Sequence, residues 1–100
     1  MKPVLVLDGS AFDDLQGFAR EVSTSLLGGH HPFHGKLDAF NDILRGGFGT
    51  PEGGFVLRWK DSARSRAALG PGLFDTLVEI IRDHGPGGAE AEDGVLLELA

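Results

Sequence analysis

The sequence predicts an α/β fold: a small three-stranded parallel sheet covered by about four helices. Two observations support this prediction. Three short apolar segments typical of strands lie far apart in the chain, at residues 4–7, 55–59 and 95–99. Each interval between them holds two segments with apolar residues at helical spacing, which gives the order β-α-α-β-α-α-β. Crossovers of this length can keep all three strands parallel, and such crossovers are right-handed.

The N-terminal part is expected to supply the first strand and the first helix. The continuous apolar run at residues 4–7 is typical of a parallel strand that is covered on both faces. A helix is predicted over about residues 13–26, because its apolar residues recur at helical spacing. Asp13, followed three residues later by Gln16, resembles a capping box, and Phe12 could pack back on the first turn.

The second half of the chain follows the same scheme. A short helix that reaches Leu69 would be capped by Asp61 or Ser62. The Gly-Pro-Gly sequence at residues 70–72 ends this helix, and a strongly amphipathic helix follows, closed by Gly85. A polar, glycine-rich loop then leads to the third strand.

Composition and charge narrow the classes of function. One hundred residues, 41% hydrophobic and 24% charged, suit one globular domain, so we expect residues 1–100 to form a single domain. No run approaches the ~20 apolar residues that span a membrane, and the apolar N-terminal run is too short for a signal peptide. The lack of cysteine excludes disulfides and suits a cytoplasmic location. The net charge of −6 argues against direct nucleic-acid binding and favours a basic protein partner.

Residues 37–44 are the most informative segment, because they combine an apolar face with an acidic one. At about 100° per residue, the apolar positions share one arc of roughly 120°: Leu37, Phe40, Ile43 and Leu44. Asp38 and Asp42 lie together on the opposite side. Like charges at i and i+4 repel by about 0.2–0.5 kcal/mol, so the pair does not help the helix to form. We expect the apolar side chains to be buried and both carboxylates to face solvent.

The residues alone leave three interpretations of Asp38 and Asp42 open. They could be part of a solvated acidic surface. They could be the paired acids of a hydrolase, although a convex helix of a small domain offers no evident cleft. They could also act as fixed anions that occupy the cationic sites of a phosphate-binding protein, since charge-assisted hydrogen bonds to guanidinium and ammonium groups are strong.

Other candidate motifs are weaker. His30, His31 and His34 could be metal ligands, but neither their spacing nor their glycine-rich setting matches a zinc motif, and we expect no metal and no cofactor. The glycines of residues 46–54 resemble a phosphate loop only in composition. The basic cluster at residues 58–66 is expected to be a solvated face, with a secondary role toward nucleic acid or a partner left open.

The segment from Gly35 to Gly46 resembles the inhibitory helix of the barstar family, protein inhibitors of the bacterial ribonuclease barnase. The family pattern is an aromatic pair, a glycine and then Leu-Asp-Ala-hydrophobic-x-Asp-x-Leu; here Phe33-His34 occupies the aromatic pair, and the spacer is one residue shorter. Three further segments agree in order with the family: the strand at 56–59, the helix ending at 80–83 and the strand at 95–99. The resemblance covers nearly the whole chain and implies a barstar-like fold.

The resemblance also implies a function. The chain would be no enzyme but an intracellular inhibitor of a small basic ribonuclease toxin, protecting the bacterium that makes both. Family inhibitors mimic the RNA phosphate with helix carboxylates and so block the active site. An alternative is a barstar-fold interaction module that binds a basic partner other than a ribonuclease. Neither a membrane nor nucleic acid is expected as a direct partner, and the free protein is expected to be a monomer.

Residue by residue, the resemblance assigns the main phosphate-mimicking role to Asp42 and a companion role to Asp38. Asp83 matches a supporting acid near the end of the last helix. Asn41 replaces a tryptophan of the family's contact surface, and Phe33 replaces a tyrosine, so we expect at best weak inhibition of barnase itself. The remaining contact residues expected from the resemblance flank the helix: His34, Gly35 and Phe48.

Overall fold

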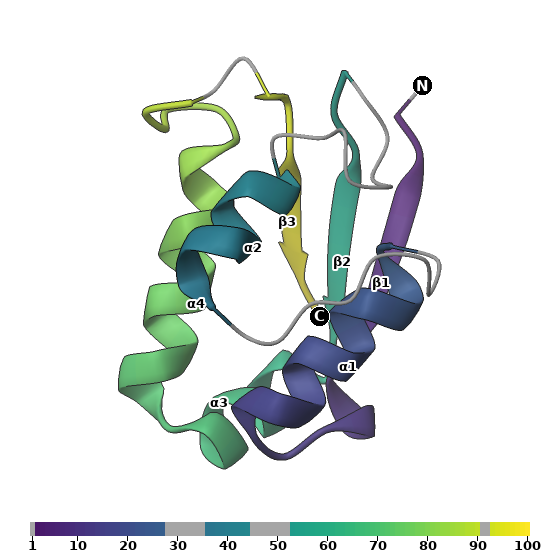
Figure 1. The fold of residues 1–100 in the computed structure, drawn as a ribbon, viewed down its shortest axis with the longest axis vertical. Coiled ribbons are helices and arrows are strands. Elements are labelled where there is room, and N and C mark those ends of the chain that lie inside the picture. Colours follow the sequence, from purple (N-terminus) through teal and green to yellow (C-terminus); the bar gives the residue numbers. More distant parts are fainter. Residues whose placement is uncertain (1, 28–35, 45–52, 91–92) are drawn as a thin grey trace.

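The predicted α/β architecture is confirmed by the computed structural model, which describes residues 2–27, 36–44, 53–90 and 93–100. Three parallel strands lie side by side in the order β1-β2-β3 (Figure 1). Their bounds are β1 at Val4–Asp8, β2 at Val56–Lys60 and β3 at Leu96–Leu99. The sheet order therefore follows the chain order, with each strand added beside the previous one.

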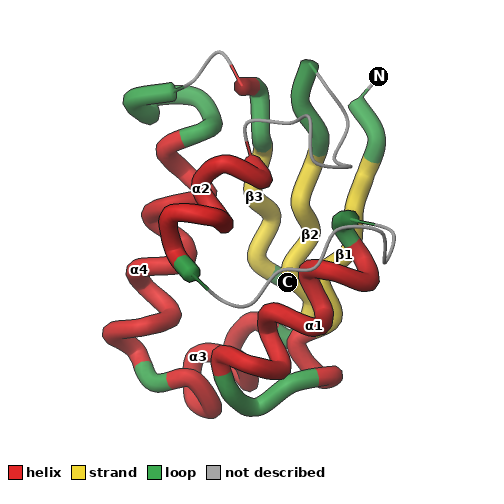
Figure 2. The backbone as a smooth tube through the Cα atoms, in the orientation of Figure 1, coloured by secondary structure: helices red, strands yellow, loops and turns green. Residues whose placement is uncertain are grey.

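Helices occupy both crossovers. The first crossover contains the 3-10 turn η1 at Gly9–Ala11, α1 at Leu15–Ser25 and α2 at Leu37–Leu44. The second contains α3 at Ser62–Leu69 and α4 at Pro71–Asp83. Figure 2 shows α4 beside β3 and α1 beside β1, and these pairs are in contact. The four predicted helices are all present within the described residues.

The sheet has one covered face and one open face, which corrects the prediction that the first strand is covered on both. Val4 and Val6 remain 47% and 38% exposed, whereas Leu7 of the same strand is fully buried. The reason lies in the topology. Two right-handed crossovers that step across the sheet in the same direction place their helices on the same face. On the open face, Arg58 and Glu98 form an ion pair at 2.9 Å between neighbouring strands.

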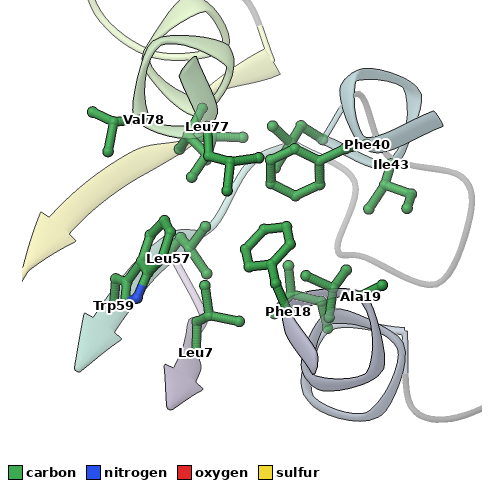
Figure 3. Packing of buried hydrophobic residues seen from close by; sticks show 14 of the residues in the cluster. Leu7, Phe18, Ala19, Phe40, Ile43, Leu57, Trp59, Leu77 and Val78 are labelled. Atoms are coloured by element: carbon green, nitrogen blue, oxygen red, sulfur yellow. The ribbon is translucent and has the colours of Figure 1, made fainter. Parts of the chain in front are cut away.

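The core lies between the covered face and the helices, and aromatic rings form its centre (Figure 3). The Trp59 ring of β2 lies 5.7 Å from Phe18 of α1 and 5.1 Å from Phe74 of α4. Phe18 in turn meets Phe40 of α2 edge to face at 5.3 Å. Aromatic pairs of this kind contribute about 0.5–1.5 kcal/mol beyond the area they bury. Phe40 therefore packs α2 onto the core, together with the buried Ile43 and Leu44.

The start of α1 differs from the prediction by one residue. Asp14, not Asp13, is the N-cap, and its side chain accepts a hydrogen bond from the Gly17 amide at 2.7 Å. Asp13 instead pairs with Arg64 at 2.6 Å. Gly17 is packed so closely that a Cβ atom there would lie 2.6 Å from the Cβ of Phe12. Glycine weakens the helix locally, but the close packing of Phe12 leaves no room for a larger residue at position 17.

The starts and ends of α3 and α4 also depend on contacts that were not foreseen. Asp61 occupies the N-cap position of α3, as predicted, but its backbone is left-handed (φ 53°) and its side chain makes no capping hydrogen bond. The Ser62 hydroxyl donates instead to the backbone oxygen of Ala100 at 2.9 Å. Pro71 occupies the first position of α4, where its missing N–H costs nothing. The last residue of α4 is Asp83, two residues before Gly85, and His84 is the C-cap.

Candidate partner-binding site

α2 presents the predicted acidic face, defined here as the side chains of Asp38 and Asp42. Both residues are exposed, and the apolar side of the helix is turned into the core. The buried side chains are Phe40, Ile43 and Leu44. Leu37 is 36% exposed, so the prediction that it is buried is wrong. It is the first residue of the helix, and side chains there tilt toward the N-terminus, past the end of the packed surface.

The two acids have different local settings on α2. Asp38 lies in the first turn, where a carboxylate is favoured by the helix dipole. Asp42 lies in the last turn of this eight-residue helix, where the dipole disfavours a negative charge by about 0.3–1 kcal/mol. Repulsion from Asp38 adds about 0.2–0.5 kcal/mol. These two effects both disfavour a carboxylate at this position of the helix.

A hydrogen bond brings the end of α4 to the acidic face. The Nε2 atom of His84 lies 2.6 Å from Oδ1 of Asn41, and α2 packs against α4. Asn41 directly precedes Asp42, and His84 directly follows Asp83. This contact therefore brings the C-terminal end of α4, which carries the exposed Asp83, beside α2. A shallow hollow adjoins it, lined by Glu79, Arg82, Asp83 and residues 86–88.

The side chain of His84 is the centre of a buried polar cluster that sequence reasoning missed. His84 is fully buried, and its Nδ1 lies 2.6 Å from Oδ2 of Asp93. Oε2 of Glu90 lies 3.6 Å from its Nε2. We call Asn41, His84, Glu90 and Asp93 the His84 cluster. A signal was present in the sequence, since a histidine after an amphipathic helix was followed by an acidic loop, but nothing linked it to Asn41.

The residue types of the His84 cluster could also bind a metal ion. The ligand atoms of His84, Glu90 and Asp93 lie within 4.8 Å of one another. Two atoms that bind one tetrahedral zinc ion at about 2.1 Å are roughly 3.4 Å apart. Both ring nitrogens of His84 lie at only 2.6 Å from an oxygen, which is a hydrogen-bonding distance. We therefore interpret the cluster as a hydrogen-bonded network.

Several predicted contact residues cannot be placed on this site. Phe33, His34, Gly35 and Phe48 lie outside the described residues, as do His30 and His31. Asn41 is described, half-buried and bonded to His84. Its side chain thus has an internal role in addition to the partner contact expected for it.

The basic cluster at residues 58–66 is partly occupied by contacts within the chain. Arg58 pairs with Glu98 across the open face of the sheet. Arg64 donates to the backbone oxygen of Gly9 at 2.8 Å and to Asp13 at 2.6 Å. Trp59, within the same stretch, belongs to the core. Two of the four cations therefore serve the fold, which weakens the case for a nucleic-acid surface.

Comparison with known proteins gives one result. A family model described as "Barstar (barnase inhibitor)" matches residues 2–99, nearly the whole chain. A search of curated proteins gives no match. Within the described residues, no helix is both long enough and apolar enough to cross a membrane.

Proposed function

This chain belongs to the barstar family, and we propose that it inhibits a ribonuclease by covering the active site of that enzyme with the acidic face of α2. The observation that carries the proposal is the exposed pair Asp38 and Asp42 on a helix seated on the core by Phe40. The two acids lie one turn apart, about 6 Å along the helix axis. They form a fixed double anion on a convex surface.

A double anion of this kind suits the active site of an enzyme that cleaves RNA. Such a site holds phosphate with lysine, arginine or histidine, and carboxylates can take the place of phosphate oxygens in charge-assisted hydrogen bonds. Asp83, exposed at the end of α4, would supply a third acid to the contact surface. We assign Asp42 the central role, because it is exposed on α2 and matches the family's main phosphate-mimicking acid.

Charge and composition support the same assignment at longer range. The net charge of −6 attracts a basic enzyme and raises its association rate. A cysteine-free chain suits the bacterial cytoplasm, where the inhibitor would protect the cell that makes the ribonuclease. No catalytic role is assigned, since the acidic pair lies on a convex helix. Asn41 and residues of the flanking loops, among them Phe33, His34, Gly35 and Phe48, would complete the contact surface.

A second candidate is a barstar-fold module that binds a basic protein other than a ribonuclease. Asn41 favours it, because the residue at the position of the family's tryptophan is half-buried and bonded to His84. Loss of that large anchor changes the shape of the surface while its charge is kept. The partner would still be basic, but it need not share the shape of barnase.

An RNA-cleavage assay distinguishes the two. Small basic bacterial ribonucleases, including any encoded beside this gene, are incubated with the wild type and with the Asp38→Asn/Asp42→Asn double variant. We expect inhibition of at least one enzyme by the wild type, strongly reduced in the double variant and retained in Asp75→Asn, which changes an exposed acid elsewhere on α4. A native basic partner that is not a nuclease would establish the second candidate instead.

A further inference from the structure

β3 is an edge strand, and half of its backbone groups are directed away from the sheet. Only β2 lies beside it in the sheet (Figure 1). The Leu96 amide donates to the oxygen of Phe55, and the Ala100 amide donates to the oxygen of Trp59, each at 2.9 Å. These bonds turn the even-numbered positions of β3 toward β2. Because successive residues of a strand direct their N–H and C=O groups to opposite sides, the odd-numbered positions face outward.

Two of the outward positions have no backbone partner. The Val95 amide donates to the oxygen of His84 at 2.8 Å, which fixes the start of the strand to the end of α4. Leu97 and Leu99 make no backbone hydrogen bond at the outer edge within the part of the chain that the structure describes. Each of them offers one N–H donor and one C=O acceptor. The spacing of these groups is that of a β-ladder, so another extended backbone is the partner that fits them.

The two edges of the sheet differ in how far they are blocked. At the β1 edge, the Asp8 amide donates to a carboxylate oxygen of Glu21 from α1 at 3.0 Å. On β3, Glu98 is the only charged residue, and Leu96 and Leu99 are exposed. Proteins usually cover or charge an exposed edge, because an apolar edge pairs readily with further strands. The β3 edge is therefore the one better suited to accept a strand.

A second hollow adjoins this edge. It has a volume of about 220 Å³, and its lining combines three residues of the edge with three at the end of α4: Val95, Leu96 and Leu97, and Arg82, Gly85 and Pro86. In a strand that pairs with β3, the side chain opposite Leu97 lies on the same face of the sheet as Leu97. The hollow therefore gives room to one side chain of an added strand.

Charge argues against a second copy of this chain as the occupant. Two copies related by a two-fold axis would pair their β3 strands antiparallel. If both unpaired positions were used, Leu97 would lie opposite Leu99, and Glu98 would lie directly opposite Glu98 of the other copy. Like charges at such positions are destabilising, and each copy carries a net charge of −6. The occupant that fits is a segment of a different protein, with a basic residue opposite Glu98.

We propose that the outer edge of β3 binds an extended segment of another protein as a fourth, antiparallel strand. Antiparallel pairing is slightly more stable per residue than parallel pairing. The segment carries a basic residue between two apolar ones. The basic side chain lies on the open face beside Glu98, of which Arg58 uses only one oxygen, Oε1. The two apolar side chains lie on the other face, beside Leu97 and Leu99.

The division of roles within this site is that of other strand-addition sites. Backbone hydrogen bonds from Leu97 and Leu99 supply affinity, while Glu98 and the hollow select the side chains of the segment. The acidic face of α2 takes no part. The proposal therefore goes beyond the inhibition of a ribonuclease and does not depend on it.

The test uses the full-length protein and synthetic peptides with blocked ends. The first peptide is Thr-Val-Lys-Val-Thr, the second has glutamate in place of lysine, and the third is the first with N-methyl groups on both valine amides. Titrations are followed by backbone amide NMR. With the lysine peptide, the amide signals of Leu97 and Leu99 should move and gain protection from hydrogen exchange. The glutamate peptide should bind about threefold more weakly, and the N-methylated peptide should not bind.

Variants of the edge separate backbone from side-chain contributions. Leu99→Pro removes one outward N–H, and proline is tolerated on an edge strand where that group faces outward, so the melting temperature should change little. It should bind the lysine peptide at least about tenfold more weakly. Leu99→Ala is the matched control, because it keeps the amide and should bind within about threefold of the wild type. Glu98→Gln should remove the preference for lysine over glutamate.

Three results would overturn the proposal. Signals that move only in residues 37–44 would show that the lysine peptide binds the acidic face by charge, whereas we expect unchanged peptide binding in Asp38→Asn/Asp42→Asn. Equal binding of the N-methylated peptide would exclude strand addition, also if Leu99→Pro fails to fold. Sedimentation of the free protein as a dimer, with the Leu97 and Leu99 amides already protected, would show that a second copy occupies the edge.

Discussion

Replacing Asp42 by asparagine should separate binding from folding. The change removes one charge and keeps the shape and nearly the same helix propensity. In the free protein it relieves the unfavourable dipole interaction of about 0.3–1 kcal/mol and the repulsion from Asp38 of about 0.2–0.5 kcal/mol. We therefore expect the free energy of unfolding to change by no more than about 1.5 kcal/mol.

In the complex the same substitution should be severe. If Asp42 enters a cationic pocket, its removal leaves a buried positive group without a partner, which costs about 3–5 kcal/mol. At about 1.4 kcal/mol per factor of ten, the dissociation constant rises by roughly two to four orders of magnitude. Stability then stays nearly constant while affinity falls, a combination that loss of a structural contact does not produce.

Denaturant unfolding and titration calorimetry with an inhibited ribonuclease measure both quantities. Asp75→Asn is the matched control, because Asp75 is an exposed acid on α4 and gives the same change in net charge. It should leave both quantities almost unaltered. A loss of stability above 2 kcal/mol in Asp42→Asn with unchanged affinity would refute the reasoning and make Asp42 a structural residue.

Four further predictions concern the core, one pH effect and salt. Gly17→Ala should destabilise the protein by about 1–3 kcal/mol in denaturant unfolding, because the added Cβ would lie 2.6 Å from that of Phe12. Alanine favours helices, so a stabilised variant would contradict this packing. Phe40→Ala should cost about 3–5 kcal/mol, measured in the same way, and should speed hydrogen exchange throughout α2; slow exchange would show that another residue seats the helix. Hydrogen bonds from the Ser10 hydroxyl and amide hold the pKa of Asp8 below its ordinary value, so this contribution to stability is present above about pH 4 and is lost as the pH falls through the lowered pKa. The free energy of unfolding, measured from pH 2 to 6, should accordingly depend less on pH in Asp8→Asn than in the wild type. Identical pH profiles of the two proteins would show that Asp8 makes no such contribution. Stopped-flow association with the ribonuclease should slow steeply with added salt, since screening acts over about 10 Å at 0.1 M, while dissociation changes little; a salt-independent association rate would exclude steering by charge.

The local periodicity of the sequence was sufficient for the element order and for the two faces of α2. Phe40 and Leu44 are buried and Asp38 and Asp42 exposed because a helix repeats every 3.6 residues wherever it is placed. The same periodicity wrongly predicted that Leu37 is buried. Leu37 is the first residue of α2, and its side chain extends past the surface that packs on the core. The one-residue shift of the N-cap to Asp14 and the missing capping hydrogen bond at Asp61 have a similar origin, since a cap depends on the path by which the chain enters the helix.

Features that depend on distant segments were decided by the tertiary structure alone. The composition of Val4–Leu7 suits a strand with two covered faces, but whether the second face is covered depends on the direction in which both crossovers step. Arg64 resembles a free surface cation until α3 places it beside the oxygen of Gly9, 55 residues earlier.

His84 is the clearest case of such a feature. A histidine after a helix is ordinary in sequence, and its partners Asn41 and Asp93 lie 43 residues before it and 9 residues after it. They become neighbours only because α2 packs against α4 and because the segment after α4 folds back on the end of that helix. Charge and face are local properties that a sequence carries in its spacing, whereas burial and hydrogen-bond partners depend on what surrounds a group, and these exist only once the chain has folded.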